Sequence, residues 1–255
     1  MPTTPLFDRD GHRNLLLEDF SGTGMAIQAN QHVIVDHGEG IILDPGGHKV
    51  YSRVLGATLG ELGRAKLKYI FLSHQDPDIV AAINGWLMTT DADAYASNLW
   101  IRFIPHFGLD HLVQARLKPI PDEGMRLKLG TSELLLLPAH FLHSCGNFHV
   151  YDPVSKILYT GDLGASPDGA AEVTDLAAHI PRITWFHQRY MQSNRALRAW
   201  TKMARSLDVE IIAPQHGGLF RGVKMVHEFY DWCDQLQCGI DVMEDIYQVP
   251  GAAAT

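Results

Sequence analysis

The stretch 71–79, with the sequence FLSHQDPDI, constrains the fold of this chain more than any other feature. Three possible metal ligands, His74, Asp76 and Asp78, alternate along it. Alternate side chains can converge on one point only where the backbone is partly extended, and Pro77 biases the residue before it towards that conformation. An imidazole and two carboxylates directed at one point would need a cation between them.

The sequence on either side places this stretch on a loop between a strand and a helix. Residues 68–70 are apolar enough for a buried strand, and the apolar spacing over 79–89 predicts a helix. A simpler interpretation is that Asp76 or Asp78 caps that helix, with Pro77 in its first turn. The rest of the sequence has to decide between a helix cap and a cation site.

Length and composition limit the possible functions. The chain has 255 residues, of which 46% are hydrophobic, enough for one large domain spanning 1–255. A net charge of -8 without a basic cluster argues against nucleic acid as a partner. No apolar run approaches the roughly 18 residues of a membrane span, and no signal peptide is evident. Three cysteines favour a reducing compartment, so we expect a cytoplasmic protein.

Periodicity predicts a mixed α and β domain. Strands are expected in blocks, with helices between them, and the final residues 251–255 are expected to be frayed. The predicted helices cover 50–62, 79–89, 98–107, 187–192, 194–206 and 223–236. The predicted strands cover 14–20, 25–36, 41–43, 68–70, 94–96, 126–129, 132–137, 148–151, 156–160 and 209–213.

Three further candidate ligands follow predicted strands. His143 lies in the loop after 132–137, Asp162 follows 156–160, and His216 follows 209–213. Each lies near a glycine or proline, where a chain leaves a sheet and exposes side chains at its edge. Together with the stretch 71–79, they predict one polar site along one edge of the sheets.

In this order the ligands resemble those of the metallo-β-lactamase superfamily, over nearly the whole chain. The resemblance implies an α+β (α/β) fold, a four-layer αββα sandwich with a two-metal site at one edge. Hydrolases of that superfamily carry His-x-His-x-Asp-His, then His, Asp and His. Here Asp76 stands in place of the second histidine and Ile79 in place of the last histidine of the motif.

The first departure is similar to the diiron branch, the flavodiiron proteins, whose motif is His-x-Glu-x-Asp. Residues 141–144 (FLHS) and 189–191 (RYM) also resemble that branch. No flavodoxin-like segment follows the last predicted helix. A single-domain version without flavin resembles the oxygen-binding diiron proteins, which are proposed sensors in bacterial chemotaxis.

The resemblance implies two iron ions bridged by an oxo or hydroxo group, with zinc or manganese as alternatives. A carboxylate in place of an imidazole makes the site harder, which favours iron or manganese over zinc. Iron 1 is assigned to His74, Asp76 and His143, and iron 2 to Asp78 and His216, with Asp162 as the bridge. Ile79 would leave iron 2 with one ligand fewer and an open, apolar-walled position for a diatomic molecule.

Three functions fit these expectations. The first is a sensor or carrier that binds dioxygen and can reduce it slowly, read by a signalling protein. The second is a dioxygen or nitric oxide reductase that takes electrons from a separate donor protein. The third is a dizinc hydrolase of the same fold. The bound molecule could be dioxygen, another diatomic or peroxide, and the flavodiiron resemblance implies a homodimer.

Other residues are weaker candidates for the metal site. Tyr190, and less strongly His187, could hydrogen-bond a metal-bound oxygen or could simply pack as helix residues. Asp44 could orient the ligand loop or form a plain turn. His140 could replace His143, although the FLHS context favours His143. Cys145 is expected to be small and buried. Residues expected to pack in the core or in a dimer contact are Trp185, Trp200 and Trp232. The remaining histidines are expected on the surface or satisfied in the core: His12, His32, His37, His48, His106, His111, His149, His179 and His227.

Overall fold

Two seven-stranded sheets face each other in the computed structural model, which describes residues 3–17, 19–22, 27–167 and 171–250. The first sheet is antiparallel over its first four strands and parallel from the fourth to the seventh. Its strands, in spatial order, are β1 (Thr4–Arg9), β2 (His12–Leu16), β3 (His32–Asp36), β4 (Glu39–Leu43), β5 (Lys66–Phe71), β6 (Asp93–Ser97) and β7 (Leu117–Ile120).

The second sheet is formed by the later part of the chain. It is also mixed, since β11 pairs with β13 in parallel whereas β8, β9, β10 and β11 form an antiparallel run. Its strands, in spatial order, are β12 (Glu172–Val173), β14 (Leu219–Arg221), β13 (Ile211–Ala213), β11 (Ile157–Tyr159), β10 (Phe148–Asp152), β9 (Ser132–Pro138) and β8 (Met125–Leu129).

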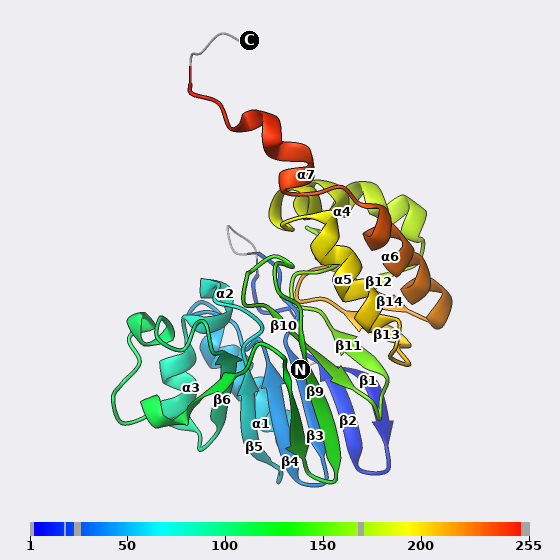
Figure 1. The fold of residues 1–255 in the computed structure, drawn as a ribbon. Helices are drawn as coiled ribbons and strands as arrows, with labels where there is room; N and C mark the ends of the chain where they lie inside the picture. Colours follow the sequence, from blue (N-terminus) through cyan, green and yellow to red (C-terminus); the bar gives the residue numbers. More distant parts are fainter. Residues whose placement is uncertain (1–2, 18, 23–26, 168–170, 251–255) are drawn as a thin grey trace.

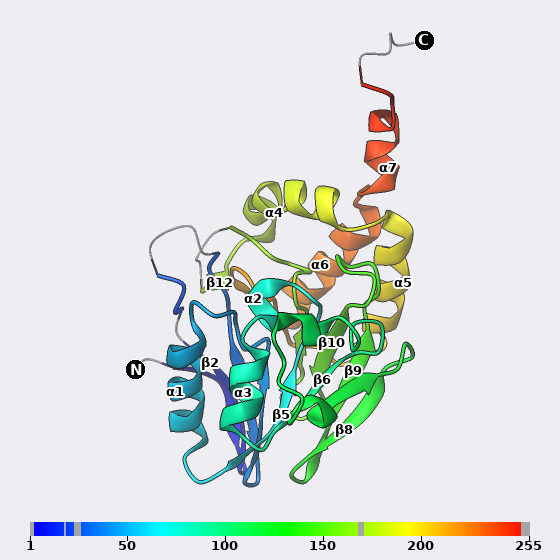
Figure 2. The same cartoon turned by 90° about the vertical axis from the view of Figure 1, so that its left-hand side faces the viewer.

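Helices cover the outer faces of both sheets, which gives the expected four layers (Figures 1 and 2). On the first sheet lie α1 (Tyr51–Leu62), α2 (Pro77–Val80) and α3 (Ile83–Thr89). On the second lie α4 (Leu176–Tyr190), α5 (Asn194–Ala204) and α6 (Val223–Gln235). The short α7 (Ile240–Met243) and a 3-10 turn (Glu244–Ile246) lead away from the body towards the C-terminus. No helix in the described part of the chain could span a membrane.

Each contact between layers has its own apolar cluster. Between the sheets, Ile34, Phe71, Phe148 and Val150 are almost fully buried. Burial of a large apolar side chain stabilises the fold by about 1.5–3 kcal/mol. Because these clusters fill the middle of the sandwich, the polar ligand loops are displaced to its edge.

Some predicted elements were wrong in extent. The predicted helix 79–89 is two pieces, α2 and α3, because the ladder stops at the bond from Ala81 N to Pro77 O and resumes at Trp86 N to Ala82 O. The predicted helix 98–107 is a set of turns with a 3-10 helix over Ile104–Phe107. Pro105 has no N–H to continue an α-helical ladder there.

Two predicted strands are shorter than expected, and several elements were missed. Of the predicted 14–20, only the part up to Leu16 is strand, and of 25–36 only β3 is strand. Residues 18, 23–26 and the tail 251–255 lie outside the described residues. Helix α4 begins eleven residues before the predicted 187–192, across Pro181. The strands that were not predicted are β1, β7, β12 and β14.

A buried ionic network ties the two sheets together at the hairpin end of β3 and β4. His12 donates from Nδ1 to Asp36 of the first sheet (3.0 Å) and from Nε2 to Asp152 of the second sheet (2.7 Å). Both ring nitrogens therefore carry protons. Burial opposes that charge, but the hydrogen bonds that His12 donates to the two carboxylates raise its pKa. Burial also opposes ionisation of Asp152, yet the bond from His12 lowers its pKa.

We expect Asp152→Asn to lower the free energy of unfolding by about 3–5 kcal/mol, because it leaves a buried imidazolium without its partner. The raised pKa of His12 makes its contribution complete below about pH 6.5 and lost as the pH rises through the folded-state pKa. The loss measured by urea unfolding should therefore be larger at pH 6 than at pH 9. The exposed Asp8→Asn serves as the control, and an equal loss for Asp152→Asn at both pH values would contradict the network.

Candidate metal centre

The six predicted ligands come together at one edge of the sandwich, although they come from four separate loops. The loop after β5 carries His74, Asp76 and Asp78. The β9–β10 loop carries His143, in which the Leu142–His143 peptide bond is cis. The loops after β11 and β13 carry Asp162 and His216. The six residues form two groups that share one carboxylate.

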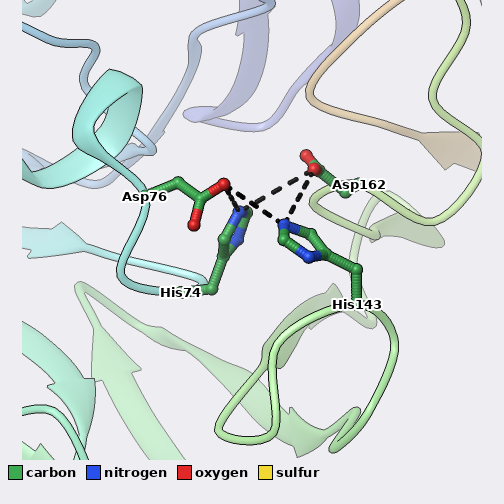
Figure 3. A group of neighbouring side chains, drawn as sticks. All are labelled: His74, Asp76, His143 and Asp162. Atoms are coloured by element: carbon green, nitrogen blue, oxygen red, sulfur yellow. Dashed lines mark hydrogen bonds and ion pairs between the residues drawn. The ribbon is translucent and has the colours of Figure 1, made fainter. Parts of the chain in front are cut away.

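The first group contains His74, Asp76, His143 and Asp162 (Figure 3). One ligand atom from each lies within 4.8 Å of the others. The Nε2 atom of His143 is 3.3 Å from Oδ2 of Asp76 and 3.3 Å from Oδ2 of Asp162. His74 Nε2 is 3.7 and 3.8 Å from the same two oxygens. Donor atoms about 2.1 Å from one ion lie roughly 3.0–3.5 Å apart, so this spacing suits a metal ion.

The second group lies on the other side of Asp162. His216 Nε2 is 3.5 Å from Oδ2 of Asp78 and 3.4 Å from Oδ1 of Asp162. The two oxygens of Asp162 thus face different groups, as a bridging carboxylate would. Its Oδ1 atom is buried and accepts no hydrogen bond from the described residues. A buried acceptor without a donor suggests an ion in that position.

Charge in the site also suits cations. Burial alone would lower the pKa of His74, but the charge of Asp162 and the contacts with Asp76 raise it to about 9. Burial likewise opposes charge on His216, but its hydrogen bond to Asp78 and the charge of Asp162 raise its pKa to about 9. The carboxylates therefore stabilise positive charge in the site, which either protons on the imidazoles or metal ions can supply.

Helix capping does not explain the acidic residues. Asp76 is the N-cap residue of α2 and has the extended backbone expected before Pro77, with φ -66° and ψ 146°. Its side chain makes no capping hydrogen bond and instead reaches His143. The capping interpretation was therefore wrong for Asp76. Although the side chain of aspartate is shorter than that of glutamate, the carboxylate of Asp76 reaches the other residues of the first group.

Contacts behind the ligands hold them in orientation. Ser73 Oγ lies 2.9 Å from Nδ1 of His74, which leaves Nε2 directed at the site. The buried Asp44 accepts a bond from Ser73 N (2.8 Å), so it supports the ligand loop and does not merely form a turn. Burial raises the pKa of Asp44 to about 6. Only glycine fits at position 47 without a shift of the backbone, because a Cβ atom there would lie 2.8 Å from Pro77 O.

A small cavity of about 260 Å³ lies over both groups. Its apolar wall is formed by Ile27, Ala165, Pro167, Trp185, Phe186 and Tyr190. Ile79, which stands in place of a histidine of the motif, does not itself form this wall. Ile79 is fully buried in the cluster beneath α1 and α3 and does not line the cavity.

Helix α4 contributes Trp185, Phe186 and Tyr190 to the apolar wall. Tyr190 is half-exposed, its ring meets His143 edge-on at 5.6 Å between centroids, and it stacks on Phe186 at 4.6 Å. It therefore contacts the site, while its proposed hydrogen bond to a ligand stays a prediction. His187 cannot play that role, because its Nε2 accepts from Gly164 N (2.8 Å) and its Nδ1 donates to Ile183 O (2.7 Å). Burial lowers its pKa to about 4.

The remaining candidates divide clearly. His140 bonds the carbonyl of Asp122 and is not in either group. Cys145 is exposed, contrary to expectation, and Trp185 is 58% exposed and not in the core, whereas Trp200 is buried. Sequence reasoning missed residues that hold ligands through hydrogen bonds, because a lone polar residue in a loop carries no pattern. These residues are Gln28, Asn30, Ser73 and Gln215.

Comparison with known proteins supports the resemblance of this chain to diiron proteins. Residues 27–217 match the family model described as ODP family beta lactamase. A solved structure described as the peroxy diiron species of the chemotaxis sensor ODP is 38% identical, with a TM-score of 0.86, over 97% of this chain and 100% of that chain. The apo state of the chemotaxis sensor ODP from T. denticola is 37% identical, with a TM-score of 0.83, over 96% and 99%.

More distant structures share the fold alone. A variant of the flavodiiron protein from Thermotoga maritima is 16% identical, with a TM-score of 0.74, over 91% of this chain and 60% of that one. No curated protein matches the sequence significantly. The expected four-layer sandwich and the resemblance to the diiron branch of the metallo-β-lactamase superfamily are confirmed.

Because Asp162 faces both groups, Asp162→Ala should abolish tight metal binding at both. Ferrous iron added without oxygen should stabilise the wild-type protein by about 2.7 kcal/mol for each site at a free concentration one hundred times Kd. Thermal unfolding should show this rise for the wild type and for the exposed control Asp91→Ala. The same rise in Asp162→Ala would rule out the shared carboxylate.

Proposed function

The chain belongs to the ODP beta-lactamase family, and we propose that it is a non-haem diiron protein that binds dioxygen as a sensor. The observation that carries this proposal is a shared carboxylate between two ligand groups beneath a small apolar cavity. The similarity to a diiron chemotaxis sensor over the full length of both chains supports it.

The size and lining of the cavity favour a small gas molecule. Pockets for drug-sized ligands have volumes of about 300–1,000 Å³, and this cavity, at about 260 Å³, is below that range. Neither lysine nor arginine is among the described residues that line it. A hydrolase acting on a phosphoester or thioester would need room and a cationic clamp for its anionic substrate. A diatomic molecule needs neither, so the dizinc hydrolase is disfavoured.

The ligand assignment follows from the two groups. His74, Asp76 and His143 would hold iron 1, Asp78 and His216 would hold iron 2, and Asp162 would bridge them. Three carboxylates with three imidazoles form a hard donor set, which suits iron or manganese better than zinc. When bound, the iron pair supplies electrons to a diatomic ligand.

The protein's own residues shape the ligand's surroundings. Trp185, Phe186 and Ile27 cover the cavity with apolar surface, which excludes water. Among the described residues that line the cavity, Tyr190 and Ser166 carry a hydroxyl donor, and we assign the hydrogen bond to the bound ligand to Tyr190.

The assembly around this site is proposed on weaker grounds. We propose one domain over 1–255, since strands from both halves of the chain share the central apolar cluster. The resemblance to flavodiiron proteins supports a homodimer. A cytoplasmic location and a signalling protein that reads the bound state complete the proposal.

A reductase supplied by a separate electron donor is the second candidate. A larger cavity of about 710 Å³ lies on the other side of His143 and Tyr190, between the loop at Phe141 and the segment around α7. A donor group there would be separated from the first ligand group by only these side chains. Steady-state consumption of dioxygen with a reducing partner would favour this function over a sensor.

Admission of air to the ferrous protein should produce a new visible absorption band. The band should accompany two iron ions for each chain, measured on the same sample. Two bound irons without any new band would contradict the proposed dioxygen binding, whereas zinc on isolation with ester cleavage would favour the hydrolase.

Tyr190→Phe should keep both irons and shorten the lifetime of that band. Loss of a hydrogen bond of about 1–1.5 kcal/mol corresponds to a roughly five- to tenfold faster decay. Stopped-flow absorbance measures the decay directly. Tyr69→Phe, at a residue of β5 that lines neither cavity, is the matched control, and an unchanged lifetime in Tyr190→Phe would contradict the assigned hydrogen bond.

A further inference from the structure

We propose that segment 28–30, which supplies no ligand, is the positioning element of the second metal group. The inference rests on the proposed two-iron site and deepens it. Asn30 is the central residue, and Gln28 assists it. Together they fix His216 and its loop, so that the second iron is held by contacts that the first iron does not share.

The first contact fixes the ring of His216. Its Nδ1 lies 2.5 Å from the carbonyl oxygen of Gln28. A carbonyl oxygen can only accept, so Nδ1 must carry a proton, and Nε2, which faces Asp78 and Asp162, is the nitrogen left to bind a metal. The tautomer that a metal requires is therefore set by the backbone of Gln28.

Further bonds hold the loop that carries His216. Asn30 Nδ2 donates to the carbonyls of Pro214 (2.9 Å) and Gly217 (2.8 Å), and Asn30 N donates to Gln215 O (2.6 Å). Gln28 Oε1 accepts from Gly217 N (2.8 Å), and Gln28 Nε2 donates to Asn30 Oδ1 (2.7 Å). The side chain of Asn30 is thus fully used, and it is buried at 6% exposure.

The same loop also orients the other ligand of this group. Gln215 Nε2 donates to Oδ2 of Asp78 at 3.2 Å, and Gln215 is almost fully buried. Both ligands that belong to the second group alone therefore depend on residues 214–217. Segment 28–30 supports that loop from the opposite side.

The first group has separate supports. Ser73 holds His74, while Gln75 donates to Asp76 (3.2 Å) and accepts from Ser144 (2.5 Å) in the loop of His143. None of these bonds involves segment 28–30. Loss of a contact behind a ligand typically costs 10–100-fold in metal affinity. A change at Asn30 should therefore weaken one metal and spare the other.

Asn30→Asp tests the inference with almost no change in shape. A carboxylate keeps the acceptor for Gln28 but loses both donors and faces two carbonyl oxygens. Anaerobic titration with ferrous iron against a chelator should show two tight equivalents in the wild type. In the variant, one equivalent should stay tight and the other should weaken about 10–100-fold.

Side-chain ¹⁵N NMR of His216 gives a readout that needs no metal. In the metal-free wild type at pH 10, where the imidazole is neutral, the proton should stay on Nδ1. In Asn30→Asp the two neutral tautomers should exchange. Asn98→Asp, at an exposed site, is the matched control and should behave as wild type in both experiments. Gln75→Ala should instead weaken the tight equivalent that Asn30→Asp spares.

Two results would overturn the inference. One is wild-type iron affinity and a single His216 tautomer in Asn30→Asp. The other is equal weakening of both equivalents in a variant whose circular dichroism shows a folded protein. If Asn30→Asp does not fold, Gln28→Met removes the side-chain bonds of Gln28 while its carbonyl remains, and the same outcomes apply to it. Fewer than two irons in the wild type would contradict the proposed function, while the NMR result would still decide the positioning role.

Discussion

One carboxylate controls the chemistry of this protein. Asp162 is buried, and each of its oxygens faces a different set of imidazole and carboxylate groups. Concentrated negative charge in a buried position is costly unless positive charge lies within a few ångströms. The fold brings four loops together at one edge of the sandwich, where the apolar layers end. Three of them follow β5, β11 and β13, and the fourth joins β9 to β10. The remaining features of the site follow from that arrangement.

Much of the fold could be predicted from the sequence, because local patterns carried it. Alternation and apolar runs identified the central strands, and the resemblance supplied the four-layer architecture. The ligands could also be predicted from the sequence, since each follows a strand and lies near a glycine or proline. Pro77 fixed the extended backbone at Asp76, which is a local effect and therefore visible in the sequence.

Features that depend on distant contacts could not be predicted. Gln28 and Asn30 look like part of a strand, but their polar groups bond the loop from Pro214 to Gly217 instead of a neighbouring strand. His12 gave no sign that it joins two carboxylates from two sheets. Ile79 takes the place of a ligand histidine in the motif, and only the structure shows that its side chain packs in the core. In each case the partner lies far away along the chain.

The position of α4 has a consequence for communication. On its inner side His187 bonds Gly164, two residues beyond Asp162, and Phe186 and Tyr190 border the cavity. Trp185 of the same helix also lines the cavity, and its side chain is 58% exposed. Helix α4 thus borders both the cavity over the two ligand groups and the molecular surface. A ligand that displaced Phe186 or Tyr190 would therefore also move Trp185, whose side chain faces solvent.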